Sequence, residues 1–248
     1  MNFAVGGGEL ELLADRAVWY ARKRAILVAD THFGKDSTFR ANAIPVPTGT
    51  TRQDLNRLDD LVAEKRADRL IILGDFFHSA ESLRDDTIDQ ILRWRQTRRY
   101  LGVWLVRGNH DKRAGDPPRA LEIEIEPDSM RLGPWRLSHY PDPVEDAYTI
   151  GGHVHPAVFL RQGRNAPVGG PCFVAGERRA ILPAFGSFTG TAEYMPEPGD
   201  RIWLLGHRRV VEVPAALLGG GRRGRRLAGG PGGNLTGEES IPERRELL

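Results

Sequence analysis

Three short apolar runs in the first half of the chain constrain its fold more than any other feature. They are AILVA at residues 25–29, LIIL at 70–73 and VWLV at 103–106, and each has the length and composition of a buried strand. The segments between them, 51–66 and 85–100, carry apolar side chains at the spacing of one helix face. A strand–helix–strand–helix–strand order predicts parallel strands in an α/β sheet that is covered by helices.

The second half of the chain has a different pattern, with many short strand candidates separated by turns rich in Gly, Pro and Asp. It contains no helix candidate of comparable length, so it predicts a second sheet built mostly of consecutive strands. The strand candidates are residues 121–125, 130–132, 135–138, 157–161, 172–175, 180–182, 201–205 and 210–213.

The composition changes at residue 219, where a stretch rich in Gly and Arg begins and apolar periodicity ends. We therefore expect one folded domain at residues 1–218 and a disordered tail at 219–248. The GRRGRR stretch of that tail is compatible with contacts to phosphate backbones, and also with a solvated segment that keeps the protein soluble.

The overall composition is that of a soluble globular protein, with 248 residues of which 40% are hydrophobic and 27% charged. The net charge of +2 does not by itself indicate a nucleic-acid or membrane partner, although a local basic patch is compatible with it. A single cysteine, Cys172, excludes an intrachain disulfide and suggests a reducing compartment. The N-terminus has no signal-peptide pattern, and no apolar run approaches the ~20 residues of a membrane helix, so we expect a cytoplasmic protein with no membrane partner.

Polar side chains of a few types follow each apolar run of the first half. Ligands of open α/β sheets bind beyond the carboxyl ends of the strands, so these side chains should meet in one crevice. Three histidines that follow strand-like runs of the second half, or lie beside them, complete the set. The residues are Asp30, His32, Asp75, Asn109, His110, Asp111, His139, His153 and His155.

These side chains are typical ligands of divalent metal ions. Carboxylate, carboxamide and imidazole groups without thiolates suit Mn, Fe, Zn, Ni or Co. They are too many for one ion, so we predict two ions that share a bridging carboxylate. Such sites hold the ions ~3.5–4 Å apart, lower the pKa of a bound water to ~7 and clamp the oxygens of an in-line phosphoryl displacement.

The sequence GGHVHP at residues 151–156 places two histidines on either side of Val154. In an extended segment, side chains two residues apart point to the same face. We therefore expect His153 and His155 to face one cavity, where they bind a ligand together. The alternative is that the two histidines lie on the surface and have no function.

The motifs DTH (30–32), GD (74–75), GNHD (108–111) and GHVH (152–155) resemble those of the calcineurin-like metallophosphoesterases. The resemblance implies an α/β (α+β) fold, a four-layer αββα sandwich with two face-to-face mixed β-sheets flanked by helices. It implies two divalent ions, with Mn²⁺ expected and Zn²⁺, Fe²⁺, Ni²⁺ or Co²⁺ as alternatives, and in-line attack by a hydroxide that bridges them. The resemblance implies that Asp30, His32 and His155 bind the first ion, that Asn109, His139 and His153 bind the second, and that Asp75 bridges the two. It also implies that His110, supported by Asp111, contacts the phosphate and protonates the leaving oxygen.

Three longer stretches narrow the resemblance. FRANAIPVPTGTTRQDLNRL at 39–58, GDFFH at 74–78 and LPAFGSFTG at 182–190 are similar to the PdeM family of bacterial ligase-associated DNA damage response endonucleases. That similarity implies a phosphodiesterase or nuclease that acts on DNA in repair. It also implies a functional association with an ATP-dependent DNA ligase, a DEXH-box helicase and an exonuclease.

Several residues beside the metal motifs have two interpretations each. Lys35 and Arg40 follow the first motif and either neutralise a substrate phosphate or are solvated loop charges. His78 either orients a ligand or contacts the substrate, or has a packing or surface role. Phe185 and Phe188 either stack on a base at the mouth of the site or belong to the core.

The first functional hypothesis is therefore a two-metal phosphodiesterase that acts on DNA. The second is an enzyme of the same chemistry with a small substrate, such as a cyclic nucleotide, a nucleotide pyrophosphate or a phosphomonoester. The third is a metal-bound scaffold in a repair complex, which a complete ligand set with His110 beside it disfavours. A long basic groove would favour DNA, and a closed pocket would favour a small substrate.

Overall fold

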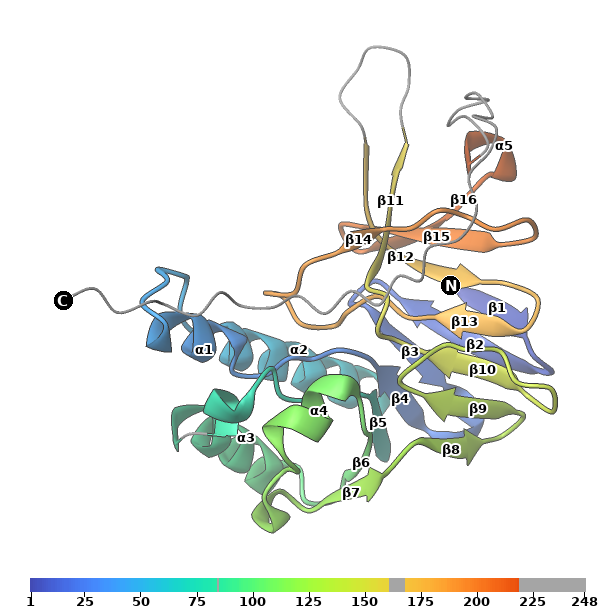
Figure 1. The fold of residues 1–248 in the computed structure, drawn as a ribbon. Helices are drawn as coiled ribbons and strands as arrows, with labels where there is room; N and C mark the ends of the chain where they lie inside the picture. The colour runs from blue at the N-terminus through green and yellow to red at the C-terminus, as the bar shows by residue number, and fades with distance from the viewer. Residues whose placement is uncertain (84, 161–167, 219–248) are drawn as a thin grey trace, which may run out of the picture.

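The computed structural model describes residues 1–83, 85–160 and 168–218 of the chain, and its fold is drawn in Figure 1. The tail that we predict at residues 219–248 lies outside the described residues, so it stays a prediction. No helix in the described part is both long and apolar enough to cross a membrane.

The first sheet has seven strands in the order β1-β2-β3-β4-β5-β6-β7. Strands β4, β5 and β6 pair in parallel, which confirms the sheet predicted from the three apolar runs. Strand β7 pairs in parallel with β6, so the prediction that residues 121–125 belong to the second sheet is wrong. Strands β1, β2 and β3 form an antiparallel meander that the sequence analysis missed. The strands are β1 (Asn2–Val5), β2 (Gly8–Leu13), β3 (Ala17–Tyr20), β4 (Ala25–Val28), β5 (Arg69–Leu73), β6 (Gly102–Val106) and β7 (Ile123–Glu126).

Helices cover the outer face of this sheet, as Figure 1 shows. The two predicted helices are confirmed as α2 and α3, and the apolar face of α2 packs against side chains of β4 and β5. The helices are α1 (Lys35–Ala41), α2 (Thr50–Lys65), α3 (Asp85–Thr97), α4 (Asn109–Ala114) and α5 (Ala215–Leu218), with 3-10 turns η1 (Ala21–Lys23), η2 (Ala80–Leu83) and η3 (Arg119–Leu121).

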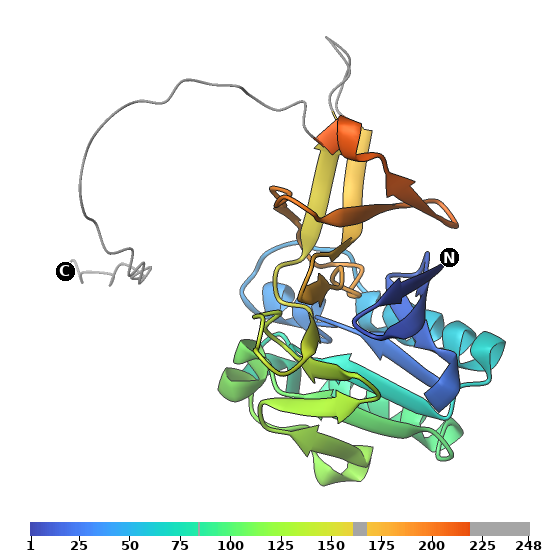
Figure 2. The ribbon, with the colours of Figure 1, turned by 90° about the vertical axis from the view of Figure 1, so that its right-hand side faces the viewer.

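The second sheet has nine strands, in the order β14-β11-β12-β13-β10-β9-β8, with β15 paired to β12 and β16 to β15. It is mixed, because β10 pairs in parallel with both β9 and β13 while most other neighbours are antiparallel. Figure 2 shows β11 and β12 extending beyond the body of the two sheets. The strands are β8 (Ser129–Leu132), β9 (Trp135–Ser138), β10 (Tyr148–Gly151), β11 (Pro156–Leu160), β12 (Val168–Ala175), β13 (Arg179–Ile181), β14 (Ala192–Glu193), β15 (Arg201–Gly206) and β16 (Arg209–Val213).

The two sheets pack face to face over a shared apolar core. Leu27 of β4 faces this core together with Leu137, Ile150 and Phe173 of the second sheet. The flanking residues of β4 point to the helices instead, as the alternation of a strand requires. The αββα sandwich is therefore confirmed, with α5 beside the outer face of the second sheet through Leu218.

Candidate metal centre

The site lies at the carboxyl ends of β4, β5 and β6, where the loops after these strands hold one another in place. The backbone N–H of Asp30 donates to the carbonyl of Gly74 (3.1 Å), and that of His32 donates to the carbonyl of Asp75 (2.8 Å). Asp30, His32 and Asp75 have left-handed φ angles of 54°, 45° and 52°. Non-glycine residues in this region are strained, and such strain is typical of functional sites.

Asp30, His32 and His155 form a first trio, in which one ligand atom from each residue lies within 4.8 Å of the others. Nε2 of His155 is 3.5 Å from Oδ1 of Asp30. Oδ1 of Asp30, both ring nitrogens of His32 and Nε2 of His155 are buried without a hydrogen-bond partner. Buried polar atoms are nearly always satisfied, so these unpaired donor atoms fit a bound metal ion.

Asp75, His139 and His153 form a second trio with the same limit of 4.8 Å. Nδ1 of His139 lies 3.1 Å from the carbonyl of Leu73 and donates to it, because a carbonyl can only accept. Nε2, which carries a lone pair when the ring is neutral, lies near Oδ1 of Asn109 (2.9 Å), Nδ1 of His153 (3.1 Å) and Oδ1 of Asp75 (3.6 Å). Four atoms that can each offer an electron pair therefore lie close together at this point. They would repel one another in the absence of a cation, and a metal ion between them would bind them.

Asp75 belongs to the second trio and also lies beside the first. Its Oδ2 is 3.8 Å from Nε2 of His32, and its Oδ1 is 3.6 Å from Nε2 of His139. Burial, and then the neighbouring Asp30 carboxylate, raise the pKa of Asp75, while His139 opposes the rise. Two divalent cations would stabilise the ionised carboxylates in this buried place. The position of Asp75 is the one that a bridging carboxylate needs.

His32 is held in the protonation state that a metal ligand requires. Burial, followed by the neighbouring rings of His110, His155 and His78, lowers the pKa of His32 to about 2. A ligand histidine must be neutral so that its nitrogen has a free lone pair. The ligand is therefore ready for a metal without the loss of a proton at neutral pH.

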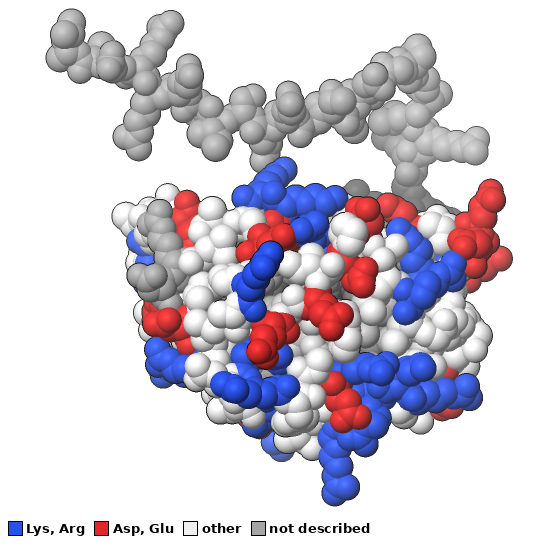
Figure 3. Space-filling model, turned by 90° about the horizontal axis from the view of Figure 1, so that it is seen from below, with Lys and Arg blue, Asp and Glu red and all other residues white. Residues whose placement is uncertain are grey.

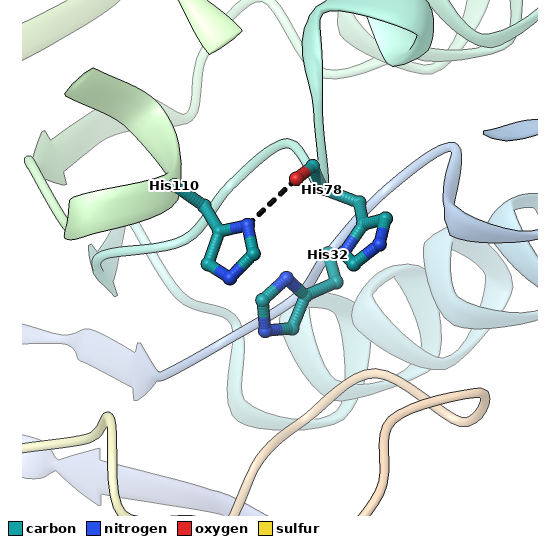
Figure 4. A group of neighbouring side chains, drawn as sticks. All are labelled: His32, His78 and His110. Atoms are coloured by element: carbon teal, nitrogen blue, oxygen red, sulfur yellow. Dashed lines mark hydrogen bonds between the residues drawn. The ribbon is translucent and has the colours of Figure 1, made fainter. Parts of the chain in front are cut away.

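His32, His78 and His110 form a third group, drawn in Figure 4. The rings of His78 and His110 stack with centroids 5.2 Å apart, and Nδ1 of His110 donates to the carbonyl of His78 (2.7 Å). Burial, then the charge of Lys35, lowers the pKa of His78 to about 4. A nearby ammonium group disfavours a third cation here and suits an anion, such as a phosphate oxygen.

Asp111 supports the site through the backbone. Its carboxylate accepts hydrogen bonds from the N–H groups of Gly108 and Asp75 (both 2.8 Å), Phe76 (2.9 Å) and Phe77 (3.4 Å). The partner that the structure gives to the His110 ring is the His78 carbonyl. The expected support of His110 by Asp111 is thus indirect, through the loop that follows β5.

The two basic residues of α1 have different surroundings. Lys35 is half-buried, its charge acts on His32 and His78, and its Nζ lies 5.9 Å from the centroid of the Phe39 ring. Arg40 donates to Oδ2 of the buried Asp36 at 3.1 Å. Lys35 therefore remains a candidate for contact with a phosphate, whereas Arg40 is engaged by an acidic neighbour of its own helix.

The two phenylalanines of the 182–190 stretch have separate roles. Phe185 is fully buried in the core beneath helix α2, and the guanidinium of Arg57 lies 4.1 Å from its ring centroid. Phe188 is half-buried, and its ring contacts that of Phe39 edge to face at 5.7 Å. The core interpretation is confirmed for Phe185, and Phe188 borders the site.

The prediction that 151–156 is extended through the two histidines is wrong. His153 and His155 have left-handed φ angles of 66° and 50°, and the N–H of Val154 donates to the carbonyl of Gly152 at 2.7 Å. The chain turns tightly here because Gly152 packs against Asp30, where a Cβ would lie 2.5 Å from Oδ2. The turn sends the two rings into different trios, as the family resemblance implies.

Sequence reasoning missed Tyr140, whose ring centroid lies 4.6 Å from that of His153 and 4.9 Å from that of His139. It also missed Phe39, whose ring stacks over His78 at 6.1 Å. Tyr140 carries no motif of its own, and its one signal is that it directly follows a predicted ligand histidine. Phe39 is the first residue of the PdeM-like stretch at 39–58, which gave no indication of its contact with His78.

Comparison with known proteins agrees with this geometry. The calcineurin-like phosphoesterase family matches residues 23–207. The crystal structure of Pseudomonas putida nuclease MPE is 40% identical in sequence, with a TM-score of 0.76 over 86% of this chain and 99% of that one. Comparison with curated proteins finds no match.

Two further solved structures are less similar. The phosphoesterase Yfce from E. coli is 16% identical over 76% of this chain and 97% of its own, with a TM-score of 0.36. The Aquifex aeolicus protein of unknown function AQ665 is 24% identical over 57% of this chain and 81% of its own, with a TM-score of 0.35. Neither of these two TM-scores is high enough to support a conclusion. The family match and the 40% identity to the MPE structure together show that this chain belongs to the calcineurin-like phosphoesterase family.

Proposed function

We propose that this phosphoesterase is a dinuclear-metal-dependent phosphodiesterase that cleaves DNA. The observation that carries the proposal is the pair of ligand trios that the carboxylate of Asp75 links. Two-metal sites of this kind suit the hydrolysis of phosphate esters. The choice of DNA is supported by the likeness to the Pseudomonas putida structure, which is that of a nuclease.

The unpaired buried atoms of the first trio fit one divalent ion. The atoms of Asn109, His153 and Asp75 that lie near Nε2 of His139 fit a second. Asp30, His32 and His155 would hold the first ion, Asn109, His139 and His153 the second, and Asp75 both. When bound, such ions lower the pKa of a water and neutralise charge that develops on phosphate oxygens. Mn²⁺ suits this set of oxygen and nitrogen ligands, with Zn²⁺, Fe²⁺, Ni²⁺ and Co²⁺ as alternatives.

Residues of the chain supply the remaining chemistry. Nδ1 of His110 donates to the His78 carbonyl, which leaves Nε2 as the nitrogen available to the leaving oxygen. Nε2 would give up a proton from the doubly protonated ring and leave the neutral ring behind. The half-buried Lys35 supplies positive charge beside the same histidines, where an anionic phosphate would be stabilised. Asp111 keeps the loop that carries Asp75 in place.

A small-molecule phosphoesterase with the same mechanism is the second candidate. The net charge of +2 is low for a protein that follows a phosphate backbone. On the face seen in Figure 3, Lys and Arg side chains are interspersed with Asp and Glu and form no continuous basic track. A cyclic nucleotide, a nucleotide pyrophosphate or a phosphomonoester would need no such track.

The proposed pathway is DNA repair, in functional association with an ATP-dependent DNA ligase, a DEXH-box helicase and an exonuclease. Its support is the PdeM-like sequence stretches at 39–58 and 182–190. The proposed location is the cytoplasm. The one cysteine, Cys172, is buried, and burial raises the pKa of its thiol to about 12, which suits a structural rather than a redox role.

The test is a substrate panel with the purified, Mn²⁺-loaded protein. It includes single- and double-stranded DNA, cyclic nucleotides, a nucleotide pyrophosphate, a phosphomonoester and a small diester. We expect the diester and DNA to be hydrolysed. Hydrolysis of cyclic nucleotides or monoesters with DNA left intact would favour the second candidate, and metal binding without any hydrolysis would favour a scaffold.

A further inference from the structure

Tyr140 covers the open side of the second trio. Its ring packs at centroid distances of 4.6 Å from His153 and 4.9 Å from His139, and its hydroxyl lies 3.5 Å from Oδ1 of Asn109. These contacts leave much of the ring uncovered, because 41% of the residue is exposed to solvent. An aromatic ring that touches metal ligands and still faces solvent is available to a substrate.

The backbone around Tyr140 is fixed. The hydroxyl of Ser138 donates to the carbonyl of Tyr140 at 2.5 Å, and the N–H of Gly152 donates to the carbonyl of His139 at 2.9 Å. Gly151 packs so closely that a Cβ there would lie 2.9 Å from the nitrogen of Pro141. A ring held in this way loses little conformational freedom when a ligand packs on it, which favours binding.

Aromatic side chains also border the opposite side of the site, beyond His78. The Phe39 ring stacks over His78 with a centroid distance of 6.1 Å, and Phe188 contacts Phe39 edge to face at 5.7 Å. These two rings cover each other and are partly enclosed. Of the three residues Phe39, Tyr140 and Phe188, Tyr140 is the exposed one.

We propose that Tyr140 is a specificity-determining residue, on whose exposed face the base of a nucleoside next to the scissile phosphate stacks. The inference rests on the proposed function, because it places a phosphodiester at the adjacent metal trio. Stacking of a base on an aromatic side chain strengthens binding roughly five- to hundredfold and tolerates any base sequence. Tyr140 would therefore select diesters that carry a nucleoside over diesters that do not.

A different role for Tyr140 would be to position His153 or Asn109, which it also touches. The two roles predict different effects on the ratio of kcat/KM between diesters that carry a base and diesters that do not. A positioning residue affects every diester alike, because all of them need the same metal ligands. A stacking residue affects only substrates with a base, so the preference for such substrates reports on it.

The experiment measures kcat/KM for thymidine p-nitrophenyl phosphate, as the 5′ and the 3′ diester, against methyl p-nitrophenyl phosphate. We expect the Mn²⁺-loaded wild type to prefer at least one thymidine diester by about tenfold or more. Tyr140→Leu and Tyr140→Gln should reduce that preference by about tenfold. Tyr140→Phe, which keeps the ring and removes the hydroxyl, should retain the preference.

The matched control is Tyr100→Leu, a tyrosine that is 63% exposed beyond the end of α3, and it should retain the preference. The proposal is overturned if the wild type shows no preference, or if Tyr140→Leu slows both substrates in the same proportion. A DNA strand is tested in parallel with the wild type. If it stays intact while the small diesters are hydrolysed, the nuclease assignment fails, and the ratio still decides the role of Tyr140.

Discussion

Two oxygens of one carboxylate face different ligand groups at this site. Oδ2 of Asp75 faces the first trio and Oδ1 faces the second, and Oδ1 also accepts the N–H of His110 at 2.9 Å. Each contact would be affected by the loss of a single charge. A substitution of this one residue therefore tests whether the site binds two metal ions.

Asp75→Asn should remove both ions and reduce the rate of diester hydrolysis by about a thousandfold or more. An amide offers one neutral oxygen where the carboxylate offers two charged ones, so it cannot bridge two cations. Elemental analysis of the purified variant measures the bound metal. The matched control is Asp89→Asn, an exposed residue of α3, which should retain wild-type metal content. Full occupancy by metal in Asp75→Asn would contradict the bridging role.

His110→Asn should keep its metal and lose rate by about a hundredfold or more, the range of a general acid. His110 belongs to neither the first nor the second trio, so its ring is not needed to bind the two metal ions. Metal content and kcat on a diester are measured together. His207→Asn, in the exposed turn between β15 and β16, serves as control. Loss of metal from His110→Asn would show that its role is wrongly assigned.

The sequence predicted which side chains the structure brings together in the two trios, because most of them lie in short motifs directly after a strand. Their backbone conformations could not be predicted. The left-handed turns at Asp30, His32 and Asp75 depend on hydrogen bonds between loops that are distant in sequence. The same holds for the contacts of Tyr140, which arise only when the loops after β9 and β10 meet.

At the scale of elements, Asp111 of the short helix α4 holds the loop after β5. Asp111→Asn should destabilise the protein by about 3 kcal/mol, since an amide nitrogen would face backbone N–H groups and leave them unpaired. Asp116→Asn is the control, because its exposed ion pair with Arg107 contributes at most about 1 kcal/mol. Urea denaturation measures both variants. Equal stability of the two would refute a role for Asp111 in bracing the loop.

The elements that the sequence predicts best are those buried on a long apolar face, such as β4, β5 and α2. Helix α1 was missed because Asp36 is its one buried residue, so it has no apolar periodicity. Strands β1 and β2 could have been found, because Gly6 and Gly7 with φ angles of 53° and 84° form a two-residue hairpin turn. Strand β10 was also missed, because its sequence YTIG contains no run of apolar residues such as that of β4.

At the scale of the whole molecule, each trio takes ligands from both sheets. Asp30, His32 and Asp75 follow strands of the first sheet, whereas His139, His153 and His155 follow strands of the second. Each ion would thus connect the two halves of the sandwich. Binding to the native state alone stabilises it, by about 2.7 kcal/mol at a metal concentration one hundred times the Kd.

Removal of metal should therefore lower the unfolding temperature of the whole domain. Thermal unfolding is compared in excess Mn²⁺ and in EDTA, for the wild type and for Asp75→Asn. We expect a higher Tm with metal in the wild type and a much smaller difference in the variant. The same Tm in both solutions for the wild type would exclude a contribution of the ions to the sandwich.

The division of each ligand set between two sheets also fixes when in the life of the protein the metal can enter. The first sheet is complete at β7, before any residue of the second has been synthesised. A nascent chain at that stage has two of the three residues of the first trio and one of the three of the second. We therefore expect complete ligand sets, and tight metal binding, only in chains whose two sheets have already docked.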